Sequence, residues 1–333
     1  MNLNKKGTMK AVTQEGPGGK LTVSDIDVPV PGKGEVLVKM KYAPINPSDI
    51  SQVNGTFAPY PAYPFTPGIE GSGVVVETGK GIIASLRSGK SVACSSKFGK
   101  GGTWAEYMVT DATRCVPLPK RVPFNKASMF FVNPMTALSF IELAKKGRHS
   151  AIVNNAAASA LGQMLQRLCT KNNITLINIV RKESQKALLE ESGAEYILNS
   201  SEAGFKEELG NLTATLGAKL FFDAVGGEQS SLFAQISPPG SRIILYAMLS
   251  EQAFTLDSRT LLQYGKQIDG FSLPLYNNTK STLALLRTTA KIKKLISDDL
   301  NSKIKAEYPL ADIEKAISAY KAEMTGGKIL LRF

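Results

Sequence analysis

The chain has 333 residues, of which 43% are hydrophobic and 20% are charged. This length predicts about two domains with a core each, and the composition excludes a disordered or fibrous chain. Because no run approaches the ~20 apolar residues of a membrane span and the first residues lack the apolar core of a signal peptide, we expect a cytoplasmic protein without a membrane partner.

The net charge of +12, from 40 Lys and Arg against 28 Asp and Glu, favours an anionic partner. A phosphorylated cofactor, an acyl carrier and nucleic acid all fit that charge. The densest basic run, at 291–294, falls in a helical pattern and has no aromatic residues between its cations. We therefore interpret it as a solvated helix face and do not expect nucleic acid.

Three cysteines, Cys94, Cys115 and Cys169, lie far apart in the sequence without C-x-x-C spacing. This spacing argues against a disulfide framework and against a thiolate zinc cluster. We expect three buried thiols.

The first 130 residues contain short alternating patterns broken by Gly and Pro, which predict a compact β domain. The predicted strands are residues 9–14, 21–28, 35–42, 73–78 and 104–109.

From about residue 127, apolar strands alternate with helices, a pattern typical of a parallel sheet wound around a nucleotide. The predicted strands are 152–153, 176–180, 196–198, 220–224, 242–246 and 268–271, and the predicted helices between them are 160–171, 184–192 and 229–236. Two helices at 281–296 and 310–322 and a strand at 328–333 follow. The fold class is thus α/β with two domains.

Residues 152–162 read as a strand, a loop of small side chains and a helix start, which together suit a pyrophosphate. Ala156 and Ser159 stand where glycine is usual, so an ordinary helix start is the alternative. About 20 residues further, the second strand ends in Arg181 and Lys182. A basic pair there suits the 2′-phosphate of NADPH, and two solvated cations are the alternative.

Five stretches carry a resemblance to a known family: YAPINPSDI (42–50), GTWAE (102–106), VNPMTA (132–137), NIVR (178–181) and DAVGG (223–227). They resemble the medium-chain dehydrogenase/reductase superfamily, nearest to the zinc-independent quinone oxidoreductases and the mitochondrial-type 2-enoyl thioester reductases. The resemblance implies a GroES-like β domain at 1–126 and 274–333, with a Rossmann-type NADPH domain at 127–273. It places the active site in the cleft between them.

The resemblance also implies the residues that line the cofactor. These are the pyrophosphate loop Ala158, Ser159, Ala160 and Leu161, the pair Arg181 and Lys182, and toward the nicotinamide Asn46, Asn133, Thr136, Tyr246, Ala247, Met248, Leu249, Phe271, Ser272, Leu273 and Lys328. Ordinary alternatives exist for several of them. Phe271 and Leu273 could be sheet core, Asn133 a helix cap, Lys328 a surface charge and Asn46 a turn residue that starts a helix.

No metal is expected. Zinc relatives carry a Cys near the position of Asn46 and a His where Ile69 stands here, and one histidine with dispersed cysteines does not suit a three-ligand zinc site. That histidine, His149, lies in a basic stretch that we interpret as an exposed turn.

In the thioester reductases a tyrosine after the NPSDI stretch assists protonation, and Phe57 occupies that position here. Phenylalanine has no dissociable proton, so the catalytic acid is open. Tyr60 and Tyr63 are candidates, and both could instead be packing or substrate-wall residues. The resemblance implies hydride transfer from NADPH to a small-molecule acceptor, either a quinone or an α,β-unsaturated carbonyl such as an enal, an enone or a 2-enoyl thioester.

A homodimer is the habit of this family. The alternative function is a nucleotide-gated RNA-binding or structural protein of the zeta-crystallin type without significant turnover. We expect such a protein to be retained on RNA in a salt-sensitive way.

Overall fold

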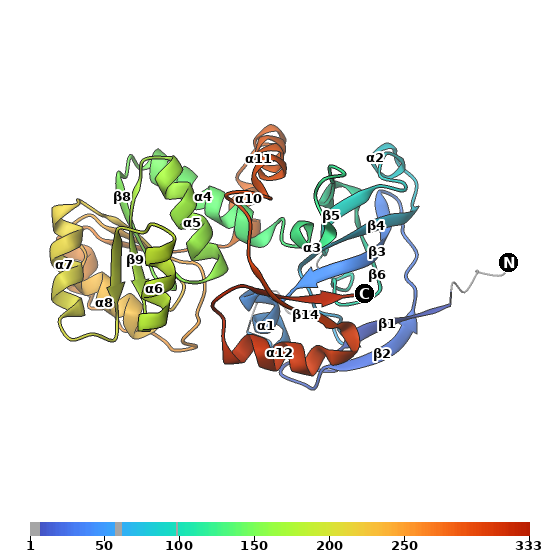
Figure 1. Ribbon diagram of the computed structural model, residues 1–333, viewed down its shortest axis with the longest axis horizontal. Helices are drawn as coiled ribbons and strands as arrows, with labels where there is room; N and C mark the ends of the chain where they lie inside the picture. The colour runs from blue at the N-terminus through green and yellow to red at the C-terminus, as the bar shows by residue number, and fades with distance from the viewer. Residues whose placement is uncertain (1–6, 57–61, 98) are drawn as a thin grey trace. The chain divides into compact units, whose positions relative to one another are not determined.

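The computed structural model describes residues 7–56, 62–97 and 99–333 (Figure 1). The chain divides into two compact units. Unit 1 is Met1–Pro134 together with Thr289–Phe333, and unit 2 is Met135–Thr288. The predicted α/β fold, with a β domain and a parallel-sheet domain, is confirmed. No helix in the described ranges is long and apolar enough to cross a membrane.

Unit 1 is built on a seven-stranded sheet of order β14-β15-β3-β4-β5-β7, with β6 paired to β3, and on the hairpin β1-β2. Its strands are β1 (Thr8–Thr13), β2 (Thr22–Asp27), β3 (Glu35–Pro44), β4 (Glu70–Thr78), β5 (Ser91–Ser95), β6 (Tyr107–Asp111), β7 (Cys115–Pro117), β14 (Ile304–Pro309) and β15 (Lys328–Arg332). Its helices are α1 (Pro47–Val53), α2 (Ile82–Ser85), α3 (Phe124–Ala127) and α12 (Ile313–Ala322).

Unit 2 holds a six-stranded parallel sheet of order β10-β9-β8-β11-β12-β13. Its strands are β8 (Ala151–Asn154), β9 (Thr175–Val180), β10 (Tyr196–Asn199), β11 (Leu220–Asp223), β12 (Arg242–Leu245) and β13 (Gln267–Gly270). Its helices are α5 (Ala160–Lys171), α6 (Glu183–Glu191), α7 (Phe205–Thr215), α8 (Glu228–Ile236), α9 (Ser258–Tyr264) and α10 (Leu273–Asn278). Two further helices, α4 (Val132–Lys146) and α11 (Thr282–Leu295), span the unit boundaries in sequence.

The order of this sheet reverses between β8 and β11. From β8 the chain proceeds outward through β9 to β10, then returns to β11 and proceeds through β12 to β13. Ligands of such sheets bind beyond the carboxyl ends of the strands at the point of reversal. The residues that follow β8, β9, β11 and β12 are therefore the ones to inspect.

Some elements differ from the sequence prediction. The strand expected at 104–109 begins instead at Tyr107, because Trp104 and Ala105 lie in an irregular segment where Ala105 makes a single bridge to Ala11. Helix α4 was not predicted, since it is buried along much of its length and therefore has no clear amphipathic period. Helix α7 and strand β14 were also missed.

Candidate functional site

Four polar side chains of unit 1 meet in its interior: Asn46 at the start of α1, Asp49 in α1, Glu70 at the start of β4 and Lys328 at the start of β15. Each is at most 6% exposed. We call them the ionic cluster. Three separate parts of the chain supply its members, so the fold of unit 1 brings them together.

Asn46 and Asp49 join the ionic cluster through the start of α1. Asn46 is the N-cap residue, and its backbone N–H donates to Oδ2 of Asp49 at 2.7 Å. The other carboxyl oxygen, Oδ1, accepts from the N–H of Ile69 at 2.9 Å. Asn46 is thus a helix-start residue whose buried amide also joins the ionic cluster, and its contact near the nicotinamide stays a prediction.

Glu70 lies at the centre of the cluster's hydrogen bonds. Its Oε2 accepts from the backbone N–H groups of Phe131 and Val132 at 2.7 and 3.0 Å, where helix α4 begins. Its Oε1 accepts from Nδ2 of Asn46 at 3.2 Å. A carboxyl group at a helix N-terminus is favoured by the helix dipole, which helps to compensate its burial.

Lys328 closes the network by donating from Nζ to Oδ1 of Asn46. It is 6% exposed, so the alternative of a surface charge is wrong. Burial lowers the pKa of Lys328, and the negative charges of Glu70 and Asp49 oppose that shift. The lysine is therefore the cation that accompanies two buried carboxyl groups.

The carboxyl groups of the ionic cluster are shifted toward their neutral forms. Burial raises the pKa of Asp49 to about 7, with a further increase from Glu70 and opposition from the Asn46 N–H and from Lys328. Burial also raises the pKa of Glu70, against the effect of Lys328 and of the helix N–H groups. Asp49 therefore titrates near neutrality, which makes it a proton-holding group within unit 1.

The predicted phosphate loop of unit 2 lies between β8 and α5. Ser159 is the N-cap of α5, and its hydroxyl accepts from the N–H of Gly162 at 3.1 Å. A Cβ at position 162 would lie 2.2 Å from the carbonyl oxygen of Ala157, so the helix packs on the loop only because Gly162 has no side chain. Ala156 adopts φ +49°, the left-handed region where glycine is more usual.

This loop is fastened to the second strand. The N–H of Ala157 donates to the carbonyl of Ile179 at 3.1 Å, two residues before Arg181. Arg181 and Lys182 are exposed at the end of β9, and their side chains make no hydrogen bond or ion pair with any residue that the structure describes. Two exposed cations therefore directly follow the strand to which the loop before α5 is hydrogen-bonded.

A carboxyl group shapes the turn after β11. Oδ1 of Asp223 accepts from Nδ2 of Asn155 at 2.6 Å and from the N–H groups of Val225 and Gly226 at 2.8 and 3.0 Å. Its Oδ2 accepts from the hydroxyl of Ser230 at 2.5 Å. Asp223 thereby ties the loop after β8 to the loop after β11, on the two sides of the point where the strand order reverses.

Buried amides form a second network on one face of the same sheet. Asn154 and Asn178 are register partners on β8 and β9, the hydroxyl of Tyr246 donates to Oδ1 of Asn154 at 3.2 Å, and Nδ2 of Asn178 donates to Oε1 of Gln166 at 2.8 Å. We call these four residues the amide row. Nδ2 of Asn154 and Oδ1 of Asn178 are buried without a partner among the described residues.

The remaining predicted cofactor residues lie mostly near the carboxyl ends of unit 2 strands. Tyr246–Leu249 follow β12, and Phe271–Leu273 follow β13. Met248 is 60% exposed, while Phe271 is half-buried and packs edge-on against Phe140 with ring centroids 5.2 Å apart. Thr136 and Asn133 are buried in the first turns of α4.

The catalytic-acid candidates are only partly described. Phe57 and Tyr60 lie outside the described residues. Tyr63 is half-buried, and its hydroxyl is buried without a hydrogen-bond partner among the residues that the structure describes. A buried hydroxyl without a partner is costly, which makes Tyr63 a candidate for contact with a bound molecule.

The histidine and the cysteines take no part in the hydrogen bonds of these networks. Gly147 and Arg148 form an exposed turn, as interpreted from the sequence, and His149 directly after it is half-buried. Burial lowers the pKa of His149, and the charges of Arg242 and Lys219 lower it further. The three cysteines are buried free thiols, as predicted. Within the described ranges, no group of three or more His, Cys, Asp or Glu side chains could hold a metal.

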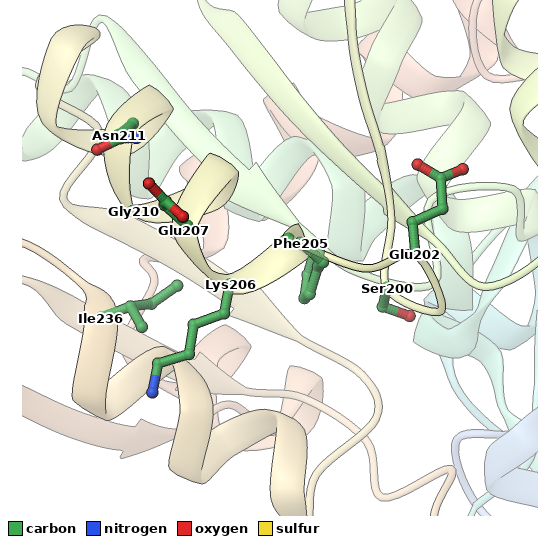
Figure 2. A pocket seen from close by; sticks show the side chains of 9 residues that line it. Ser200, Glu202, Phe205, Lys206, Glu207, Gly210, Asn211 and Ile236 are labelled. Carbon is green, nitrogen blue, oxygen red and sulfur yellow. The ribbon is translucent and has the colours of Figure 1, made fainter.

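A groove lies along α7, and none of the residues predicted for the cofactor lines it (Figure 2). Glu202 and Glu207 line it, and Lys206 in its wall donates to Gln235 at 2.8 Å. Two carboxylates against one engaged lysine do not suit an anionic cofactor. We therefore place the candidate site at the strand ends.

Sequence reasoning missed Asp49, Glu70, Asn154 and Asp223 as partners in these networks. A usable signal was present for the last two, because a polar residue directly after a run of apolar strand residues lies at a strand end. For Asp49 and Glu70 the sequence contains no comparable signal, since their partner Lys328 is more than 250 residues away.

Known families match the chain in the same order as its units. The alcohol dehydrogenase GroES-like domain matches residues 32–120, and the zinc-binding dehydrogenase family matches residues 160–288. These matches fall on the β-rich part of unit 1 and on the parallel sheet of unit 2.

Individual proteins are similar over longer stretches. The mitochondrial enoyl-[acyl-carrier-protein] reductase of Caenorhabditis elegans is 31% identical over 72% of this chain and 69% of its own length, and that of Xenopus tropicalis is 29% identical over 93% and 91%. A solved structure from Mesorhizobium loti, provisionally described as an NADPH:quinone reductase, covers all of both chains at 29% identity with a TM-score of 0.92. The chain therefore belongs to the medium-chain dehydrogenase/reductase superfamily of oxidoreductases, in the branch of the quinone oxidoreductases and enoyl reductases.

Proposed function

We propose that this oxidoreductase uses NADPH to reduce a quinone or an α,β-unsaturated carbonyl compound, including a 2-enoyl thioester. The observation that carries the proposal is the pair of exposed cations, Arg181 and Lys182, directly after the strand to which the loop before α5 is hydrogen-bonded. Similar proteins are named enoyl-[acyl-carrier-protein] reductases and, provisionally, an NADPH:quinone reductase. These names support the acceptors and the cofactor that we propose.

The start of α5 fits a pyrophosphate. This helix has 12 residues, so its dipole and its first unpaired N–H groups favour an anion. Small side chains at Ala158, Ser159 and Ala160 allow the backbone to approach the phosphates. The partnerless Nδ2 of Asn154, at the end of β8, supplies a buried donor in the same part of the sheet.

The two cations discriminate between cofactors. A 2′-phosphate accepts charge-assisted hydrogen bonds from a guanidinium and an ammonium group, whereas a free 2′-hydroxyl gains little from two positive charges. Because neither side chain is neutralised by a described neighbour, both remain available to a phosphate. The arrangement favours NADPH over NADH.

The bound nicotinamide supplies the hydride, and the protein positions the acceptor and manages the proton. In unit 1, Asn46 and Lys328 hold each other in a fixed orientation, and Asp49 holds or releases a proton near neutral pH. The buried hydroxyl of Tyr63 is a candidate donor to the oxygen that becomes negative in an unsaturated carbonyl. A quinone can take its protons from solvent.

The cofactor assignment is tested with Arg181→Asp. We expect NADPH binding to weaken by about 1 to 3 kcal/mol, through loss of a charge-assisted bond and added repulsion, with little change for NADH. Lys219→Asp is the matched control, because Lys219 is an exposed cation directly before the amino end of β11. Titration that shows equal losses for the two cofactors would contradict the assignment.

The acceptor class is tested by following NADPH absorbance with quinones, short enals, enones and crotonyl thioesters. We expect turnover with at least one of these classes. Salt-sensitive retention on RNA, with no NADPH consumption across the panel, would instead support a binding protein without turnover.

A further inference from the structure

Two cysteines of unit 1 are opposite each other on neighbouring strands, and the thiol of Cys94 donates to the carbonyl of Gly71 at 3.6 Å rather than to any member of the ionic cluster. In the antiparallel pair of β5 and β7, Cys94 is the register partner of Cys115. Both side chains belong to one hydrophobic cluster, with exposures of 0% and 1%. Directly opposite residues on adjacent strands project to the same face of a sheet.

The hydrogen bonds show which kind of pair this is. The N–H of Leu118 donates to the carbonyl of Ser91 at 2.9 Å, so this pair is a hydrogen-bonded one. Since the two kinds alternate, Ala93 with Val116 is also hydrogen-bonded and Cys94 with Cys115 is not. In agreement, the N–H of Cys115 donates to the carbonyl of Ala112.

Side chains approach most closely at such non-hydrogen-bonded pairs, where Cα atoms are ~4.5 Å apart. A disulfide needs Cα atoms ~4.4 to 6.8 Å apart, so a pair of this kind suits a disulfide. We propose that Cys94 and Cys115 are a redox modification site that closes to a cross-strand disulfide by exchange with a small-molecule disulfide.

The exchange proceeds in two steps. The thiolate of one cysteine attacks the small disulfide, which releases one small thiolate and leaves a mixed disulfide on the protein. The thiolate of the other cysteine then attacks the protein sulfur of that mixed disulfide and releases the second small thiol. The protein loses two electrons and two protons, and the small disulfide is reduced to two thiols.

While β7 is paired with β5, burial of the two thiols makes their exchange with a disulfide slow. It raises the pKa of Cys94 well above the ordinary value and that of Cys115 to about 12. We take strand β7 as the part that opens, because it has only three residues and is the last strand in the order of the sheet. When β7 separates from β5, Cys115 becomes accessible, and re-pairing presents it to Cys94.

The test treats the folded, full-length chain with excess oxidised glutathione, blocks free thiols in denaturant and maps peptides by mass spectrometry. We expect Cys94 and Cys115 to appear in one linked peptide, with Cys169 still alkylated and the link reversed by dithiothreitol. Cys94→Ala should stop at a glutathione adduct on Cys115. Cys169→Ala is the matched control, because it replaces another buried cysteine and should leave the link intact.

Two results would overturn the proposal. One is a stable glutathione adduct on Cys115 in the unmutated chain, which would show that Cys94 cannot reach it. The other is that both thiols are still free after long oxidation of the folded chain, while the same thiols react readily in the unfolded chain. Amide exchange at Val116 gives a check that needs no variant, since a link across the strands should slow its exchange relative to the reduced protein.

Discussion

The ionic cluster of unit 1 and the amide row of unit 2 are both buried polar networks, yet they differ in what holds them. The first joins two carboxyl groups and an ammonium group, and every charged member has a partner of opposite sign or an N–H donor. The second joins neutral groups and leaves one donor and one acceptor without described partners. A buried charge must be matched, whereas a neutral amide can remain partly unmatched at modest cost.

This comparison predicts the largest loss for Lys328→Met. The change removes the cation and leaves Asp49 and Glu70 buried together, so we expect a loss of about 3 to 5 kcal/mol in the free energy of unfolding. Urea denaturation followed by circular dichroism measures it. Lys33→Met, at an exposed lysine of the same unit, should change stability by less than about 0.5 kcal/mol. Equal effects of the two variants would show that the ionic cluster is not a stabilising unit.

The pH dependence of stability tests the cost of a buried charge at Asp49. Its pKa is raised from 3.8 to about 7 in the folded protein, so the folded state holds this proton more tightly than the unfolded state. The contribution of Asp49 to stability is therefore greatest at low pH and is lost as pH rises from about 4 to about 7, by about 2 to 4 kcal/mol. Subtracting the profile of Asp49→Asn from that of the unmutated chain isolates this slope. A difference that is flat over that window, or that rises with pH, would contradict the assignment.

Asp223→Asn tests whether the stability loss depends on the charge of the network or on the unit in which the network lies. Asp223 lies in unit 2 but has a carboxyl group that accepts four hydrogen bonds. Because an amide offers one acceptor oxygen, we expect a loss of about 1.5 to 3 kcal/mol, closer to the ionic cluster than to the amide row. Chemical denaturation of the variant and of the unmutated chain measures this loss. A loss below about 0.5 kcal/mol would mean that the unit in which a network lies matters more than whether the network is charged.

The smallest effect is expected for Asn154→Val. The change removes a buried donor that has no described partner but also takes the acceptor from the Tyr246 hydroxyl, so the unfolding free energy should fall by about 1 kcal/mol. Measurement without cofactor keeps binding out of the comparison. A loss as large as that of Lys328→Met would show that the amide row is fully matched, for instance through a buried water between Asn154 and Asn178.

The sequence predicted unit 2 better than unit 1, because the elements of unit 2 can be recognised from patterns of neighbouring residues. Helix α5 and strand β9 have clear periodicity, and Arg181 and Lys182 could be placed at a strand end from that pattern alone. Helix α4 could not be predicted, because a helix buried on several sides shows no polar face. Lys328 was placed near the cofactor only by resemblance, and its burial beside Glu70 depends on β15 lying next to β3. Pairings between distant strands leave no trace in a local pattern.

The hydrogen bond between Lys328 and Asn46 joins residues 282 positions apart, and all of unit 2 lies between them. During synthesis, unit 2 is therefore complete while the cation that accompanies Asp49 and Glu70 has not yet been made. Unit 1 must wait for its last strand, because β3 pairs with β15 and long-range closure is slow. We expect nascent chains to gain protease resistance first in unit 2, and to protect the segment around Asp49 and Glu70 only when β15 has been released.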